Sequence, residues 1–165
     1  MKGKLITLLL ALTVSLGVQS QKKLPNITLK NLNGKEVLSS DLSNDGKPMV
    51  ISFWATWCKP CLSELSAFND EYEDWVEETE VKIIAISIDD ARTNARVKSM
   101  VLGNDWPFEV YLDPNQDFKR ALSIVNVPHT LVLNGKGEVV WEHSTYNPGS
   151  EEEVITQVRH LVNNQ

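Results

Sequence analysis

The feature that most constrains this chain is a close pair of cysteines, Cys58 and Cys61, the only two cysteines among its 165 residues. The apolar run of residues 49–55 comes directly before the pair and is typical of a buried strand. Residues 61–75 then place apolar side chains three or four positions apart, which predicts a helix. The pair therefore lies where a strand passes into a helix, and it is either a redox couple or a metal clip.

The N-terminal end of the expected helix favours a reactive first cysteine. Unpaired backbone N–H groups and the positive end of the helix dipole favour an anion there, so we expect a lowered pKa for Cys58 and a nucleophilic thiolate. Lys59 adds a positive charge beside it, and Cys61 would resolve a mixed disulfide with a substrate. Pro60 fits the first helical turn, where its missing N–H is not needed, and is expected to stiffen that turn.

A disulfide between the two cysteines would contribute little to folding stability, so a redox role explains it better. It closes a very short loop, which constrains the unfolded chain little, and a chain of 165 residues can bury a core without it. The alternative is a zinc clip to which His129 or His143 adds ligands. Structural zinc sites usually show four protein ligands at recognisable spacing. The redox interpretation is therefore favoured, with no cofactor or metal beyond the cysteine couple.

The N-terminus predicts export. A basic start precedes the apolar stretch 5–18, a pattern typical of a secretory signal peptide. We expect a signal over residues 1–20, cleaved after Ser20, and one domain over residues 21–165. An uncleaved anchor is the alternative, although the stretch is shorter than the roughly 20 residues of a spanning helix. Exported thiols lie in an oxidising compartment such as the periplasm, so a reducing role there needs an electron donor.

The charge of the chain argues against one class of partner. The formal net charge is -6 at pH 7, and no cluster of lysines and arginines alternates with aromatic residues. Because phosphate backbones are bound chiefly through positive charge, we expect no nucleic-acid partner.

The rest of the sequence alternates strands and helices. Two apolar runs, 49–54 and 81–88, enclose the helix that starts at the cysteines, which predicts a right-handed βαβ unit with parallel strands. Residues 22–42 predict a hairpin that turns at Asn33-Gly34. The other expected elements are a helix over 90–102, a strand over 108–112, a short helix over 117–124, a hairpin of 127–133 with 138–143, and a last helix that Ser150 caps.

The stretch 53–61, which reads FWATWCKPC, resembles the thioredoxin superfamily, as do the late Val127-Pro128 and the closing hairpin and helix. Glu64 and the inserted helix and strand of 90–112 make the resemblance closer to exported thiol-disulfide oxidoreductases of the TlpA/ResA type. The resemblance implies a thioredoxin-like α/β fold. In that fold, helices flank a central mixed sheet that has an N-terminal β-hairpin extension and a helix-strand insertion in its middle.

The same resemblance implies a protein-disulfide reductase. Its substrates would be disulfides in other exported proteins, among them apocytochromes c that await haem, and a membrane-bound thiol donor would supply the electrons. The motif does not fix the direction of electron flow, so a net oxidant or isomerase is the enzymatic alternative. A protein that handles Cu(I) through both thiolates and His129 is the non-enzymatic alternative. A peroxiredoxin is not favoured, because both cysteines belong to one pair.

The sequence allows two alternative environments for the Glu64 side chain. One helical turn beyond Cys61, it is either a solvated carboxylate or a group buried beneath the sulfurs, whose raised pKa lets it exchange protons near neutral pH. Cytoplasmic thioredoxins carry a buried Asp five residues before the Trp of the redox motif, and this chain has Ser52 there. The proton-transfer role of that Asp would therefore fall to Glu64.

The substrate surface is expected from the resemblance and from the aromatic residues of the motif. A cis Val127-Pro128 bond would bring an extended backbone beside Cys58, where it can pair with a substrate segment. His129, where relatives commonly have Thr, is either a plain strand residue or one that tunes the thiolate. Trp54 is expected in the core and Trp57 at the rim of the surface. The residues expected to contact substrate are Trp57, Pro60, Val127, Pro128 and His129.

Overall fold

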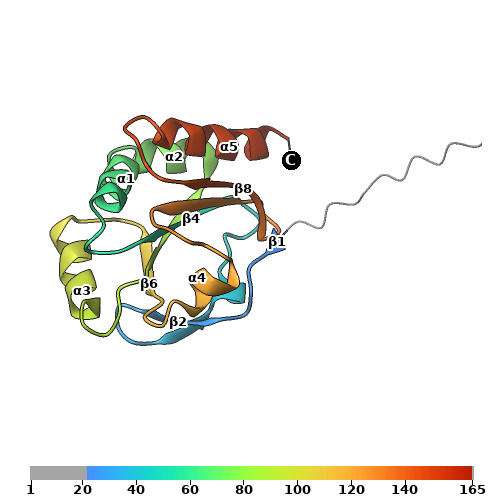
Figure 1. The fold of residues 1–165 in the computed structure, drawn as a ribbon. Helices are drawn as coiled ribbons and strands as arrows, with labels where there is room; N and C mark the ends of the chain where they lie inside the picture. Colours follow the sequence, from blue (N-terminus) through green and yellow to red (C-terminus); the bar gives the residue numbers. More distant parts are fainter. Residues whose placement is uncertain (1–21, 165) are drawn as a thin grey trace, which may run out of the picture.

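The computed structural model describes residues 22–164, and within them one mixed sheet forms the centre of the molecule (Figure 1). Its strands lie in the order β1-β8-β7-β4-β5-β6-β2-β3. The expected signal peptide over residues 1–20 lies outside the described residues. No helix within residues 22–164 is both long and apolar enough to cross a membrane.

The strands and helices follow the expected alternation. The strands are β1 (Lys22–Lys23), β2 (Thr28–Asn31), β3 (Glu36–Leu38), β4 (Met49–Trp54), β5 (Lys82–Ser87), β6 (Glu109–Leu112), β7 (His129–Leu133) and β8 (Glu138–Ser144). The helices are the 3-10 turn η1 (Ser39–Asp41), α1 (Lys59–Asp70), α2 (Tyr72–Thr79), α3 (Asn94–Gly103), α4 (Asp117–Ala121) and α5 (Glu151–Asn163).

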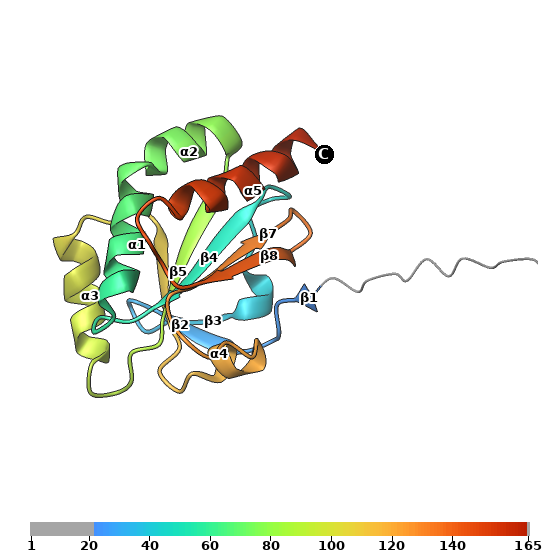
Figure 2. The ribbon, with the colours of Figure 1, turned by 45° about the horizontal axis from the view of Figure 1, so that its top comes forward.

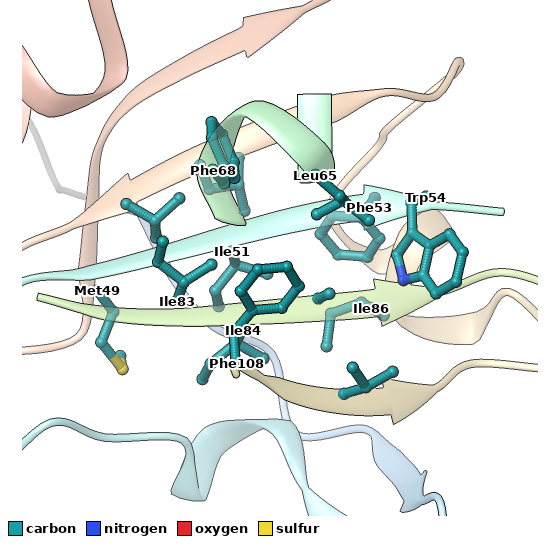
Figure 3. Close-up of a cluster of buried hydrophobic side chains, with 14 of the residues drawn as sticks. Met49, Ile51, Phe53, Trp54, Leu65, Phe68, Ile83, Ile84, Ile86 and Phe108 are labelled. Carbon is teal, nitrogen blue, oxygen red and sulfur yellow. The ribbon is translucent and has the colours of Figure 1, made fainter. Parts of the chain in front are cut away.

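The centre of the sheet is built as the apolar runs predict. All six residues of β4 are buried, and β4 pairs in parallel with β5 on one side and antiparallel with β7 on the other. Helices α1, α2 and α5 cover one face of the sheet, and α4 lies on the other face (Figures 1 and 2). Leu65 and Phe68 of α1 pack onto β4 and β5 in the core (Figure 3). On the opposite face, the ring of Phe53 lies 5.2 Å from that of Phe118 in α4.

The single helix expected over 61–75 is wrong in its extent. It begins at Lys59 and divides at Glu71, which ends α1 and begins α2. Figure 2 shows α2 leaving α1 at an angle. Asn69 and Asp70 just before the break are weak helix formers. The change of direction brings Trp75 into the core, where its ring lies 5.4 Å from that of Phe68.

The N-terminal hairpin is present, but it is shorter than predicted. Strands β2 and β3 pair antiparallel around Asn33-Gly34, and β2 joins the sheet beside β6. Lys22 does not belong to this hairpin, because β1 pairs with β8 at the opposite edge of the sheet. Its ammonium group donates a hydrogen bond of 2.6 Å to the carbonyl of Leu122, which holds the N-terminal segment at that edge.

The inserted helix and strand also lie between β5 and the last hairpin, with later starts than predicted. Helix α3 begins at Asn94 because the carbonyl of Asp90 accepts the N–H groups of Thr93 and Asn94, so residues 90–93 form a turn. Helix α4 ends at Ala121 and is followed by a turn in which Ser123 has a φ of 63°. The antiparallel pairing of β7 with β8 is as predicted.

Candidate active site

The cysteine pair lies at the N-terminal end of α1 and is joined in a disulfide. Cys58 caps the helix, and its sulfur accepts a hydrogen bond of 3.3 Å from the backbone N–H of Cys61. Lys59 and Pro60 form the first two helical positions and are exposed. Cys58 therefore sits where helix N–H groups and the helix dipole stabilise a thiolate, as the sequence predicts.

Cys61 and Glu64 share the buried face of α1. They are one helical turn apart, a spacing that places two side chains on the same side of a helix, and both are buried. Glu64 is only 3 % exposed. Of the two fates expected for this carboxylate, the structure shows the buried one.

Two hydroxyl groups hold the Glu64 carboxyl. Ser52 Oγ donates to Oε2 over 2.7 Å, and Thr130 Oγ1 donates to Oε1 over 2.9 Å. Ser52 of β4 and Thr130 of β7 are direct partners across the antiparallel ladder, so their side chains stand side by side on the same face of the sheet. Ser52, the residue at the position of the thioredoxin Asp, thus serves as a donor to the acid that α1 supplies.

Burial raises the pKa of Glu64 to about 7, from an ordinary value of 4.5. Loss of hydration is the largest cause, because the ionised carboxylate is disfavoured away from water. The hydrogen bonds from Ser52 and Thr130 oppose this rise, and the negative charge of Glu151 adds to it. A carboxyl with this pKa can both take up and release a proton near neutral pH.

The aromatic residues of the motif divide between core and surface as predicted. Trp54 is buried, and its ring meets that of Trp106 edge to face at 5.1 Å. Trp57 is 60 % exposed next to Cys58. The Val127-Pro128 bond is cis, and Pro128 is buried. The contact of these residues with a substrate stays a prediction.

His129 points away from Glu64. Neighbouring residues of a strand face opposite sides of a sheet, and Thr130 faces Glu64, so His129 lies on the side of Phe53 and α4. Its Nδ1 shares a hydrogen bond of 2.6 Å with Ser144 Oγ, and its Nε2 lies 3.6 Å from a Glu142 carboxylate oxygen without a hydrogen-bond partner. Both ring nitrogens are thus directed at β8, and neither makes a hydrogen bond to a sulfur.

Burial lowers the pKa of His129, because the imidazolium form is disfavoured away from water. The nearby Glu142 carboxylate opposes that change, whereas the positive charge of Lys22 adds to it.

In the described part of the chain, no three His, Cys, Asp or Glu side chains gather to hold a metal ion. His129, which both the zinc and the copper alternatives name as a ligand, directs its ring nitrogens at Ser144 and Glu142 of β8.

Two residues of the site were missed by sequence reasoning. Thr130 reads as an ordinary β-branched strand residue, and only its pairing with Ser52 reveals its contact with Glu64. Asp89 lies two residues beyond the end of β5. Its carboxylate accepts hydrogen bonds from the backbone N–H and the hydroxyl of Thr56, in the loop before the cysteines. A polar residue at the carboxyl end of a buried strand is the signal that points to such a position.

Comparisons with known proteins agree with this site. A family model described as the AhpC/TSA family matches residues 20–142. The chain belongs to the AhpC/TSA family. A thiol-disulfide oxidoreductase ResA from Bacillus anthracis is 32% identical over 123 residues, which cover 74% of this chain and 68% of the relative. The sporulation thiol-disulfide oxidoreductase A of Bacillus subtilis (strain 168) is 25% identical over 126 residues, covering 73% of this chain and 74% of the relative.

Solved structures show the same fold. An uncharacterized thioredoxin-like protein from Porphyromonas gingivalis is 48% identical, with a TM-score of 0.77 over 86% of this chain and 92% of the other. A putative thiol:disulfide interchange protein DsbE from Chlorobium tepidum, 21% identical, has a TM-score of 0.74 over 86% of this chain and 96% of the other, and shows the fold alone. The fold is thioredoxin-like, and the cysteine pair within it makes the chain a thiol-disulfide oxidoreductase.

Proposed function

We propose that this chain reduces disulfides in other exported proteins, with Cys58 as the nucleophile, Cys61 as the resolving thiol and Glu64 as the proton acceptor. The observation that carries the proposal is the buried Glu64 carboxyl, with a pKa of about 7, on the same face of α1 as Cys61. A resolving thiol that is buried needs a base nearby, because its thiolate is costly to form away from water.

The reaction balances as a two-electron exchange. The Cys58 thiolate attacks one sulfur of the substrate disulfide, which forms a mixed disulfide and releases the other substrate sulfur as a thiolate that takes a proton. Glu64 accepts the proton of Cys61. The Cys61 thiolate then attacks the Cys58 sulfur, closes the intramolecular disulfide and releases the second substrate thiolate. Two electrons pass from the cysteine pair to the substrate, and the product is the disulfide form that the structure shows.

The substrate surface is proposed around Trp57 and the Val127-Pro128 segment. The exposed ring of Trp57 lies beside Cys58 in sequence and offers apolar contact. Residues 126–128 form a bend that leads through the cis Val127-Pro128 bond into β7, and we propose that backbone groups of this segment pair with a substrate segment. Pro60 and His129 lie close to these positions in the sequence. Apocytochromes c with oxidised haem-binding cysteines are one proposed substrate class.

Export and a dedicated electron donor complete the proposal. The basic and apolar pattern of residues 1–20 supports secretion into the periplasm or another oxidising compartment of the cell envelope. A reductant there must be returned to its dithiol form after each turnover, so a membrane-bound thiol donor is proposed as the partner.

The reduction potential of the Cys58-Cys61 couple tests the proposed direction. Equilibration with a dithiothreitol or glutathione series gives the potential. A value near that of thioredoxin, about −270 mV, fits a reductant, whereas a value near that of DsbA, about −120 mV, would make the chain an oxidant. Reduction of an oxidised CxxCH peptide would then test the apocytochrome substrate, with a Cys58→Ser variant as the inactive control.

A further inference from the structure

Asp89 is a second buried carboxylate next to the redox loop. It follows β5 and is 0 % exposed. Its Oδ1 accepts from Thr56 Oγ1 over 2.6 Å, and its Oδ2 accepts from the Thr56 N–H over 2.8 Å and from Ser87 Oγ over 2.9 Å. Its own N–H donates to Ser87 Oγ over 3.1 Å. The side chain thus joins the end of β5 to the loop that leaves β4.

Hydrogen bonds, and not an ion pair, stabilise the buried Asp89 carboxylate. None of the ion pairs formed among residues 22–164 includes Asp89. A buried charged group without a counter-charge is costly unless donors surround it. Two of its three donors belong to Thr56, so the loop cannot move away from Asp89 without leaving the carboxylate poorly satisfied.

The loop that Asp89 holds sets the position of the nucleophile. Thr56 is two residues before Cys58, and the same turn is closed by the Cys58 N–H, which donates to the Ala55 carbonyl over 3.0 Å. The Cys58 sulfur in turn accepts the N–H of Cys61 at the helix end. A hydrogen bond to a thiolate weakens quickly when its distance or angle is poor.

We infer that Asp89 is a positioning residue of the redox site, which clamps Thr56 and so keeps the Cys58 sulfur aligned with the N-terminal N–H groups of α1. This inference rests on the proposed role of Cys58 as nucleophile. It assigns the acid at the end of β5 a task separate from that of Glu64, which exchanges a proton.

Thr56→Val is the variant that tests the clamp. It keeps the shape of the side chain and the charge of Asp89, and it removes only the hydroxyl donor. Asp89→Asn is less suitable because loss of the negative charge would itself favour the thiolate. The readout is the rate of Cys58 alkylation by iodoacetamide in the reduced protein, measured across pH and located by mass spectrometry of peptides.

We expect Thr56→Val to move the midpoint of this pH profile upward by about one pH unit, because a weakened hydrogen bond to a charged group is worth roughly that much. Thr56→Ser, which keeps the donor, should retain the midpoint of the unmodified chain. If Thr56→Val lowers only thermal stability and leaves the midpoint in place, Asp89 is merely structural and the inference is wrong.

Ser87→Ala keeps the inference testable should Thr56→Val fail to fold. Ser87 donates to Asp89 and not to the loop, so a smaller upward shift of the midpoint is expected, and no shift would contradict the clamp. The unmodified protein separates the two proposals. If Cys58 is not the thiol that alkylates first, the proposed function fails; if it is, and neither variant shifts its profile, only the clamp fails.

Discussion

Glu64 and His129 are both buried and ionisable, but they lie on opposite faces of the central sheet. On the face covered by α1, the Glu64 carboxyl lies between the hydroxyls of Ser52 and Thr130. On the face of α4, the His129 ring bonds Ser144 and faces Glu142 of β8. Burial favours the neutral form of each group, so it raises the pKa of the acid and lowers the pKa of the base.

Burial alone does not make an ionisable side chain a proton-transfer group, because a reacting atom must also lie close to it. The face that carries Glu64 also carries Cys61 one helical turn away, so a proton that Glu64 gains or loses is close to a reacting sulfur. The face that carries His129 directs the ring to β8. The two groups should therefore differ in their effect on the reaction and should change stability in opposite pH ranges.

The largest expected effect is on the exchange rate of Glu64→Gln. Loss of a general acid-base group typically costs roughly 100- to 10,000-fold, so reduction of a small disulfide near neutral pH should slow at least 100-fold. The measurement is stopped-flow kinetics of the reduced protein. His129→Gln is the matched variant on the other face, and we expect it to slow the reaction far less. Equal losses in the two variants would remove the distinction between the faces.

The second effect is on the pH dependence of stability. The pKa of Glu64 rises from 4.5 unfolded to about 7 folded, so the stability that its neutral form contributes is fully present below about pH 4.5 and is lost as the pH rises through about 7. The loss is about 3 kcal/mol. Urea unfolding of the oxidised protein at several pH values measures it. Glu64→Gln should lack this decline, and a parallel decline in both proteins would refute the assignment.

A smaller effect is expected from the hydroxyl groups that hold Glu64. Thr130→Val removes a donor that favours the ionised carboxylate, so the pKa of Glu64 should rise further, by up to about one pH unit. In the same unfolding series, the pH at which stability stops falling should move upward. Thr130→Ser keeps the donor and serves as the control. A pKa that falls in Thr130→Val would show that the contact acts in another way.

The smallest effect is expected at His129. Its pKa is lowered from 6.5, chiefly by burial, so the stability that its neutral form contributes is present above about pH 6.5 and is lost as the pH falls. Glu142 opposes the shift, which limits its size. Relative to His129→Gln, the unmodified protein should lose stability as the pH falls below about 6.5. A loss at rising pH instead would contradict the burial of a neutral ring.

Much of the fold follows from local patterns in the sequence. The apolar runs of β4 and β5 and the cysteine pair between strand and helix predict the centre of the molecule, and the turn at Asn33-Gly34 predicts the hairpin. The pairing of Lys22 with β8, by contrast, depends on contacts between distant segments. A local pattern carries no signal of such contacts.

The candidate site divides in the same way. Cys58, Cys61 and Glu64 could be named from spacing and resemblance, because they lie on one helix. Thr130 could not, because its partner Glu64 is 66 residues away in the chain. Asp89 has only its place after a buried strand as a signal, since its partner Thr56 is 33 residues away. The face on which His129 lies depends on the register of β7 against β4, which sequence alone does not specify.

The most direct test of the account is an NMR titration of the Glu64 side-chain carboxyl carbon in the oxidised protein. In this form the cysteines do not titrate, so the curve reports the buried acid itself. Glu64→Gln identifies the resonance by its absence. We expect a midpoint near pH 7. A midpoint near 4.5, the ordinary value for Glu, would show that the carboxyl is ionised at neutral pH and would remove it as the proton acceptor for Cys61.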